Sequence, residues 1–275
     1  MTSNPSKLPE YRKPPVAEVA LSVQFQPIPG FGFPHMGLLW AEFKKELPVV
    51  QQHPPLPRTV EDFGVPVGPR ITLEAGMMQG FPSPRVWFLD KAGAELVQVQ
   101  NDRLVVNWRK VDDGLQYPRY NTVRARFDEA IAKFRRFLRD HDFPDMAPDQ
   151  CEVTYVNHCL AGEVWSDLGE IDRVVSMWRG LDGFLPNPEE VQFAARYQIT
   201  DDQEILGRLH VTVEPARRIS DHRPLLVMQL VARGAPVGDG LEGVGRFLDV
   251  GHEWIVRGFT SITTPEMHAE WERLE

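Results

Sequence analysis

The clearest pattern of hydrophobic and polar positions lies in two neighbouring runs, at residues 96–100 and 103–109. They are separated by Asn101 and Asp102, residue types that tolerate positive φ and favour a two-residue turn between antiparallel strands. The pattern therefore predicts a β-hairpin whose register is fixed by its turn. In that register Gln100 lies opposite Arg103, Gln98 opposite Val105, and Leu96 opposite Asn107.

The two faces of this hairpin differ in chemistry because successive side chains of a strand point to opposite sides. One face is apolar and is expected to contact the core: Val97, Val99, Leu104, Val106 and Trp108. The other face carries amide and guanidinium groups, with Leu96 and Val105 among them: Gln98, Gln100, Arg103, Asn107 and Arg109. We expect this polar face to be either solvated surface or the lining of a wet groove.

The remaining periodic segments predict alternating strands and helices along the whole chain. Residues 121–141 have a helical apolar stripe and a basic opposite side. A Pro- and Gly-rich segment, 48–84, is expected to be a covering loop, with a strand-like run at 70–76. Further helices are predicted at 35–47, 168–179, 241–262 and after Thr263 or Thr264, and further strands at 16–25, 151–160, 191–199, 208–214 and 225–233.

The order of these elements predicts an α+β protein built from two similar halves. After an N-terminal arm (1–15), residues 16–145 and 146–275 each read as strand, helix, several strands and a long helix. We expect each half to be a curved antiparallel sheet packed against its long helix, with the two halves packed as one unit. This is the architecture of TATA-binding-like or helix-grip folds, an analogy of architecture alone.

Composition excludes a few classes of protein. The chain has 275 residues, is 42% hydrophobic and 25% charged, and has no apolar run long enough to cross a membrane. Residues 1–145 carry 19 Lys and Arg against 17 Asp and Glu, so residues 146–275 carry 11 against 22.

The two cysteines, Cys151 and Cys159, lie on one predicted strand and are too far apart to form a disulfide with each other. A reducing, cytoplasmic location is expected.

Several stretches together resemble an uncharacterised, sporadically distributed family of bacterial proteins of about 250–280 residues. They are PPVAEVALSVQF, RVWFLDKAGAELVQVQNDRLVVNWRK, YPRY, CEVTYVNHC and FTSITTPEMHAEW, which span the chain from residue 14 to 271. The resemblance implies a bacterial, cytoplasmic protein. It supplies no activity and no catalytic residue, because none is established for the family.

Candidate chemistry outside the hairpin lies on the strand 151–160. Tyr155 and Asn157 share its inward face and need hydrogen-bond partners, which makes them candidates for a pocket or an ordering network. His158 lies on the opposite face of the strand, which it shares with Glu152. The sequence has no phosphate-binding loop, no nucleophile-elbow motif, and no Cys or His spacing typical of a metal site, so no cofactor and no metal are expected.

Three functions remain open. The preferred one is a binding or interaction protein that uses the polar hairpin face for an anionic small ligand, a peptide or a protein partner, because amides and guanidiniums suit such groups. The second is a hydrolase-like or other enzyme with a non-standard site at Glu152, His158 and His210. The third is nucleic-acid binding through helix 121–141, which the net charge of −9 disfavours. We assign no catalytic residue, and we add a homodimer to the expected assemblies.

Overall fold

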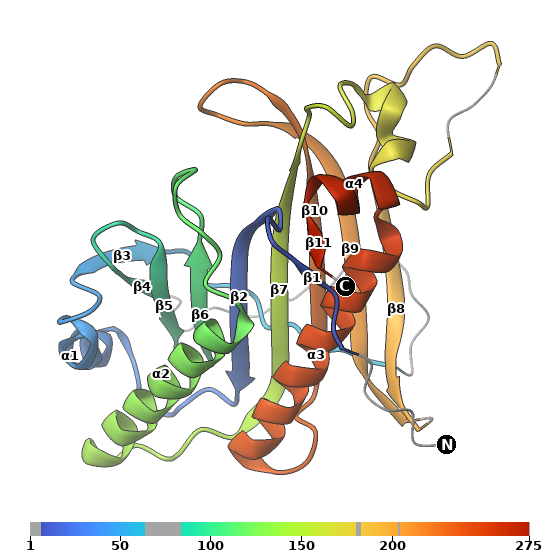
Figure 1. The fold of residues 1–275 in the computed structure, drawn as a ribbon. Coiled ribbons are helices and arrows are strands. Elements are labelled where there is room, and N and C mark those ends of the chain that lie inside the picture. Colours follow the sequence, from blue (N-terminus) through green and yellow to red (C-terminus); the bar gives the residue numbers. More distant parts are fainter. Residues whose placement is uncertain (1–6, 64–83, 180–182, 203, 275) are drawn as a thin grey trace.

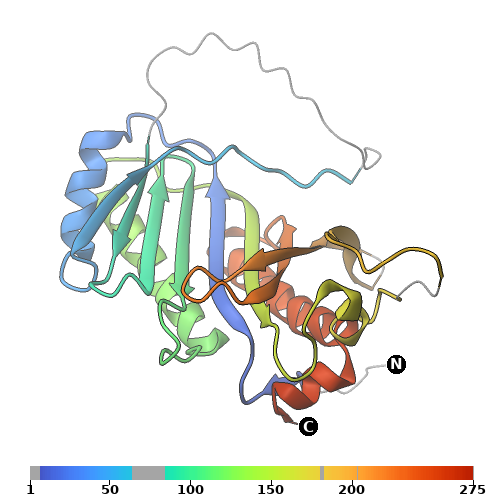
Figure 2. The ribbon, with the colours of Figure 1, turned by 90° about the horizontal axis from the view of Figure 1, so that it is seen from above.

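One antiparallel sheet forms the centre of the molecule in the computed structural model, which describes residues 7–63, 84–179, 183–202 and 204–274. In this part of the chain the sheet has nine strands in the order β3-β4-β5-β6-β2-β7-β10-β9-β8. Long helices cover one of its sides, and an irregular segment crosses the other (Figure 1, Figure 2). The predicted α+β class with a large antiparallel sheet is confirmed.

The strands are β2 (Val16–Phe25), β3 (Val49–His53), β4 (Arg85–Leu89), β5 (Glu95–Gln100), β6 (Arg103–Arg109), β7 (Pro148–Leu160), β8 (Phe193–Asp201), β9 (Glu204–Arg217) and β10 (Pro224–Gly234). A small separate pair joins β1 (Glu10–Tyr11) to β11 (Arg273–Leu274). The helices are α1 (Phe33–Phe43), α2 (Tyr120–Asp140), α3 (Gly240–Ile262) and α4 (Pro265–Glu270), with a short 3₁₀ helix η1 (Leu168–Arg173).

The predicted hairpin is the pair β5–β6. Gln100 pairs with Arg103 and Gln98 with Val105, so the register expected from the two-residue turn is confirmed. The five side chains of its apolar face are no more than 5% exposed. They lie in the core between the sheet and the helices because alternation places them all on one side.

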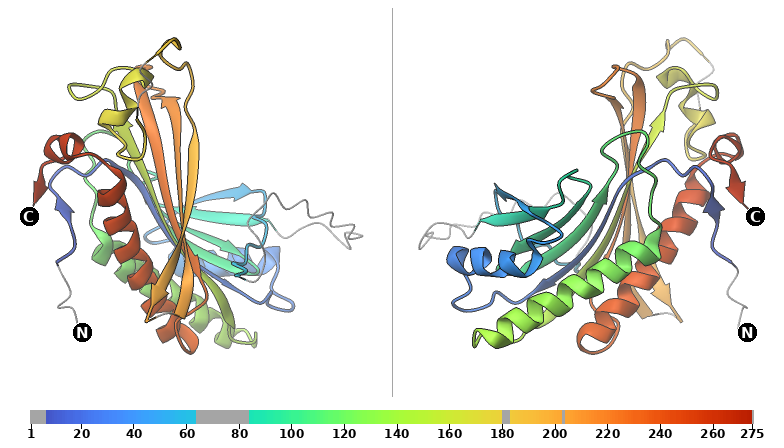
Figure 3. Two further views of the ribbon diagram at one scale, coloured as in Figure 1. Left: turned by 90° about the vertical axis from the view of Figure 1, so that its right-hand side faces the viewer. Right: turned by 60° about the vertical axis from the view of Figure 1, so that its left-hand side comes forward.

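The helices bury apolar stripes against the same side of the sheet. The stripe of α2, which includes Phe127, Ile131 and Phe134, is buried where α2 crosses β2 and β6. α3 packs in the same way on β7, β10 and β9. Figure 3 shows α2 and α3 lying next to each other across this side.

Three local expectations differ from the structure. Residues 168–179 form only η1, because the chain beyond it bonds instead to the end of α3: Val175 bridges Thr263, and the Ser176 amide donates to Ile262. Part of the predicted covering loop forms the edge strand β3. Residues 10 and 11 of the expected N-terminal arm form β1. The strand-like run 70–76 lies outside the described residues.

Candidate functional site

A segment without regular secondary structure, residues 54–63, crosses the polar side of the sheet. We call it the strap. It leaves β3 at the edge of the sheet and runs over the side opposite the helices (Figure 2). In the described part of the chain, no hydrogen bond between main-chain groups joins the strap to a strand. Side chains of the sheet hold it instead.

A row of polar side chains on four adjacent strands lies beneath the strap. Gln100 of β5 is opposite Arg103 of β6, Arg103 is opposite Gln24 of β2, and Gln24 is opposite Gln150 of β7. Side chains directly opposite one another share a face of the sheet. The three glutamines are buried, with exposed fractions of 2 to 6%. We call these four residues the amide row.

The first two glutamines of the amide row each bind both main-chain groups of one strap residue. The Gln100 amide donates to the Leu56 carbonyl (3.0 Å) and accepts from the Leu56 N–H (2.9 Å). The Gln24 amide donates to the Thr59 carbonyl (2.6 Å) and accepts from the Thr59 N–H (3.1 Å). The sheet thus binds the strap much as a neighbouring strand would, but through side-chain amides.

The other two members of the row each make one contact to the strap main chain. Arg103 donates to the Pro57 carbonyl (2.9 Å), and the Gln150 side-chain oxygen accepts from the Glu61 N–H (3.0 Å). The Nε2 group of Gln150 is buried and has no partner among the described residues. Contacts therefore run along the strap from Leu56 to Glu61.

The Glu61 side chain ends in a cluster of three cationic or titratable groups from β9 and β10. Its carboxylate accepts from Arg208 (2.8 Å), lies 2.6 Å from His210 Nε2, and is 3.3 Å from Arg233. The side chain of Glu61 is only 6% exposed. We call Arg208, His210 and Arg233 the carboxylate cradle.

The cradle keeps Glu61 ionised. Burial alone would raise the pKa of this carboxyl group, but hydrogen bonds from His210 and Arg208, with the charges of His210 and Arg233, lower the pKa to about 2. Arg233 also donates to Glu152 through Nε (2.6 Å). The strap is therefore anchored by a buried anion with several charge-assisted hydrogen bonds.

The remaining polar residues of the hairpin do not contact the strap. Gln98 donates to Asn107 (2.7 Å), Asn107 donates to Glu18 (2.6 Å), and Arg109 donates to the Gly93 carbonyl. Gln98 and Asn107 are 7% and 5% exposed, so the expectation of a solvated surface is wrong for these two residues. They form a buried polar layer that orders the hairpin beside the amide row.

The three candidate residues of β7 lie elsewhere. Tyr155 points to the helix side of the sheet, Asn157 donates to the Met228 carbonyl (3.2 Å), and His158 is exposed. Because β7 is continuous, the separation of six positions between Glu152 and His158 places them roughly 20 Å apart. The structure does not bring these three candidates to the strap, and it does not gather Glu152, His158 and His210 into one site.

Tyr155 belongs to a buried network between the sheet and the helices. Its hydroxyl lies 2.8 Å from that of Tyr117 and 3.0 Å from His252 Nδ1, and the His252 ring stacks on Tyr120. Burial lowers the pKa of His252 to about 4, against smaller opposing effects of nearby carboxylates. Tyr120 donates to Asp249 (2.7 Å). These contacts link β7 to α2, to the chain just before α2, and to α3.

The basic side of α2 is neutralised by neighbouring carboxylates. All six cations expected there, Arg124, Arg126, Lys133, Arg135, Arg136 and Arg139, form ion pairs. Their partners come from residues 42–145, apart from an additional contact between Arg124 and Asp249 at 3.7 Å. The acidic second half is therefore not their main partner.

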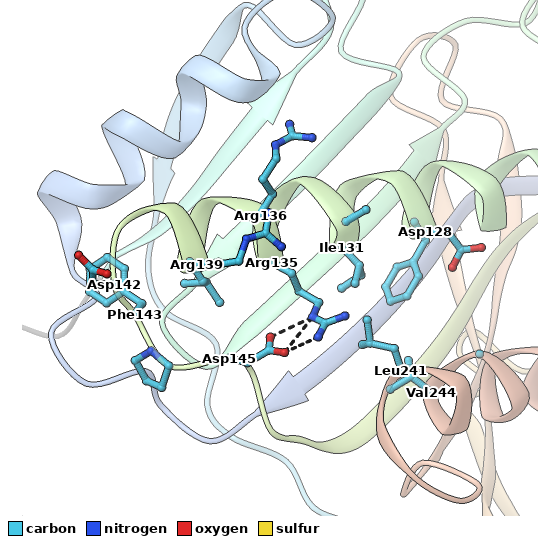
Figure 4. Close-up of a pocket in the computed structure, with 15 residues that line it drawn as sticks. Asp128, Ile131, Arg135, Arg136, Arg139, Asp142, Phe143, Asp145, Leu241 and Val244 are labelled. Carbon is cyan, nitrogen blue, oxygen red and sulfur yellow. Dashed lines mark hydrogen bonds and ion pairs between the residues drawn. The ribbon is translucent and has the colours of Figure 1, made fainter.

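A groove of about 1050 Å³ lies between α2, the chain that follows it, and the start of α3. Figure 4 shows Arg135 paired with Asp145 within this groove. Its apolar walls, including Ile131 and Val244, are already buried. The three arginines that line it, Arg135, Arg136 and Arg139, each pair with an exposed carboxylate.

The sequence could have suggested some members of the site and not others. Gln24 lies on the polar face of the strand predicted at 16–25, and Glu61 lies in the segment expected to cover the sheet. Their meeting with Gln150, Arg208 and Arg233 depends on the pairing β2–β7–β10–β9, which no local pattern encodes. These five residues are therefore absent from the sequence-based candidates.

Comparison of the chain with protein-family models, with curated proteins and with solved structures found no match. Within the described residues, no helix has the length and apolar character needed to span a membrane. The same residues contain no group of three His, Cys, Asp or Glu side chains placed to hold a metal ion.

Proposed function

We propose that this protein is a binding protein whose polar sheet face takes an anionic partner. The observation that carries the proposal is the carboxylate cradle, where Arg208, His210 and Arg233 surround a single buried carboxylate. Guanidinium groups bind carboxylates with directional, charge-assisted hydrogen bonds. In the structure the occupant is Glu61 of the strap, and the proposed partner places its own anionic group there.

The geometry favours binding over the two alternatives. An enzyme with Glu152, His158 and His210 in one site would need these groups within hydrogen-bond reach of a common substrate, whereas His158 lies far along β7. Nucleic-acid binding through α2 would need free cations, whereas all six of its expected cations are paired with carboxylates. Both alternatives remain without a supporting contact in the described residues.

The proposal can be tested with fluorescein-labelled decaglutamate as the probe. In the variant Glu61→Ala the cradle loses its internal carboxylate, and we expect decaglutamate to bind at least tenfold more tightly than to the unmodified protein in an anisotropy titration. The matched control is Asp145→Ala, which removes a carboxylate from an exposed ion pair and should leave the affinity unchanged.

Two further results decide the proposal. Adding Arg208→Ala and Arg233→Ala to Glu61→Ala should abolish the gain, and decaglutamine should bind to none of the variants. Equal decaglutamate binding with and without the two arginines, in proteins that retain the circular dichroism spectrum of the unmodified chain, would overturn it.

We also propose that the two halves are related by internal duplication. From the central pair β2–β7, the strands run outward as β6, β5, β4 on one side and β10, β9, β8 on the other, and a long helix follows β6 and β10 alike. Two free, buried cysteines fit a reducing compartment, so a cytoplasmic location is part of the proposal. A homodimer and the predicted bacterial family remain predictions.

A further inference from the structure

We infer that the partner is an extended polypeptide with one acidic side chain, bound across the strands by the amide row, and that the strap occupies this site as an internal competitor. The inference rests on the proposed function, because it uses the same carboxylate cradle. It adds a second requirement, which is recognition of the partner's main chain.

Main-chain recognition follows from the paired contacts of Gln24 and Gln100. Each amide binds the N–H and the C=O of the same residue, a donor and an acceptor that every non-proline residue of a peptide presents. A small carboxylate in the cradle would leave the Gln24 and Gln100 amides without these main-chain partners. A ligand that replaces the strap in full therefore needs a peptide main chain.

The spacing of the contacts fits an extended chain perpendicular to the strands. Gln100 and Gln24 are two strands apart, about 10 Å at a strand separation of about 4.8 Å. The three steps along the chain from Leu56 to Thr59 span about the same distance at about 3.3 Å per residue. Glu61 follows Thr59 by two residues and reaches the cradle. The site therefore selects a peptide with an acidic side chain five positions after the residue bound by Gln100.

A second feature of the strap adds specificity. Arg58, three residues before Glu61, donates to the Phe25 carbonyl (2.8 Å) and pairs with Asp149. Pro57 between the two bound residues is tolerated because only its carbonyl is used, as the acceptor for Arg103. A basic residue three positions before the acidic one is therefore the second preference of the site.

The strap can leave the face without unpairing the sheet. Its contacts are side chain to main chain or side chain to side chain, and no described main-chain pair ties it to a strand. The strand before it remains fixed, because His53 of β3 pairs with Arg85 of β4. Among the described residues, exchange of the strap for a partner segment therefore breaks side-chain contacts and no strand pairing.

The test uses a labelled peptide with the strap sequence, PPLPRTVEDF, and the Glu61→Ala protein. We expect binding at least tenfold tighter than to the unmodified protein, and a loss of at least tenfold when the peptide glutamate is replaced by glutamine. N-methylation at the peptide positions of Leu56 and Thr59 should also weaken binding at least tenfold, because it removes the N–H groups that donate to Gln100 and Gln24.

The matched control is the same peptide N-methylated at the position of Val60, whose N–H makes no hydrogen bond to the described residues. It should bind like the parent peptide. If Glu61→Ala does not fold, a variant with residues 56–62 replaced by alternating Gly and Ser vacates the same face and is used instead.

Polyacrylate, a polyanion without peptide groups, separates the two proposals. If polyacrylate and all the peptides bind equally, and binding still requires Arg208 and Arg233, main-chain recognition is overturned and the proposed function stands. If neither the peptides nor polyacrylate nor decaglutamate binds the vacated face, both are overturned.

Discussion

Glu61 is the residue on which the binding account depends most. A buried carboxylate is stable only when it is paired and hydrogen-bonded, and the cradle provides both. Because its pKa in the folded protein lies near 2, below the ordinary 4.5, the stabilisation is complete above pH 4.5 and is lost as the pH falls toward 2. At neutral pH the strap is therefore fully anchored.

Limited trypsin digestion tests this anchoring, because Arg58 lies within the strap and its guanidinium is bound. We expect Glu61→Gln to speed cleavage after Arg58 at least tenfold, since breaking a buried ion pair costs about 3–5 kcal/mol. Asp145→Asn, in an exposed pair with Arg135, is the matched control and should leave the cleavage rate unchanged. An unchanged rate in Glu61→Gln would show that the carboxylate does not hold the strap.

His252 gives a prediction on pH that is independent of the strap. Burial lowers its pKa to about 4, below the usual 6.5, so the unfolded chain binds the extra proton between these values and stability falls as the pH drops from 6.5 toward 4. We expect the unmodified protein to lose about 2 kcal/mol more unfolding free energy than His252→Gln between pH 7 and pH 5. Urea unfolding at pH 7 and pH 5 measures these free energies. Equal losses in the unmodified protein and in His252→Gln would contradict the burial of a neutral imidazole.

At the scale of elements, the sequence predicts best where one periodicity runs unbroken. The stripes of α2 and α3 and the alternation of β2 locate these elements to within a residue or two. The apolar stripe at 168–179 predicts a helix that does not form over its full length. Ile171, Val174 and Val175 are buried as expected, but the main chain turns to bond with the end of α3. β3 has no hydrophobic pattern that would predict a strand, because four of its five side chains are exposed and they do not alternate with buried ones.

Two glycines in different helices give a matched pair for testing how tightly the elements pack. A Cβ at Gly243 of α3 would lie 2.2 Å from the Gly238 carbonyl oxygen, whereas a Cβ at Gly37 of α1 would meet nothing within 4 Å. Alanine favours a helix over glycine by about 1 kcal/mol. We expect Gly37→Ala to stabilise the protein by up to about 1 kcal/mol and Gly243→Ala to destabilise it by about 1–3 kcal/mol. Urea unfolding midpoints compare the stabilities of the two variants. An increase in stability for Gly243→Ala would contradict the close contact with the Gly238 carbonyl oxygen.

At the scale of the whole molecule, the order of the strands in the sheet brings the residues of the site together. The hairpin β5–β6 and its polar face follow from the sequence, and so does the expectation that the 48–84 segment covers the sheet. The amide row and the cradle do not, because they join strands from both ends of the chain through the central pair β2–β7. Long-range pairing of this kind depends on the global topology, which local patterns do not specify.

Hydrogen exchange at the Leu56, Thr59 and Glu61 amides of the unmodified protein measures how firmly the amide row holds the strap, because these three N–H groups donate to Gln100, Gln24 and Gln150. We expect slow exchange for the protein alone, and faster exchange when millimolar decaglutamate displaces the strap from the polar face. Exchange as fast as in an unstructured peptide, or slow exchange that decaglutamate does not change, would contradict it.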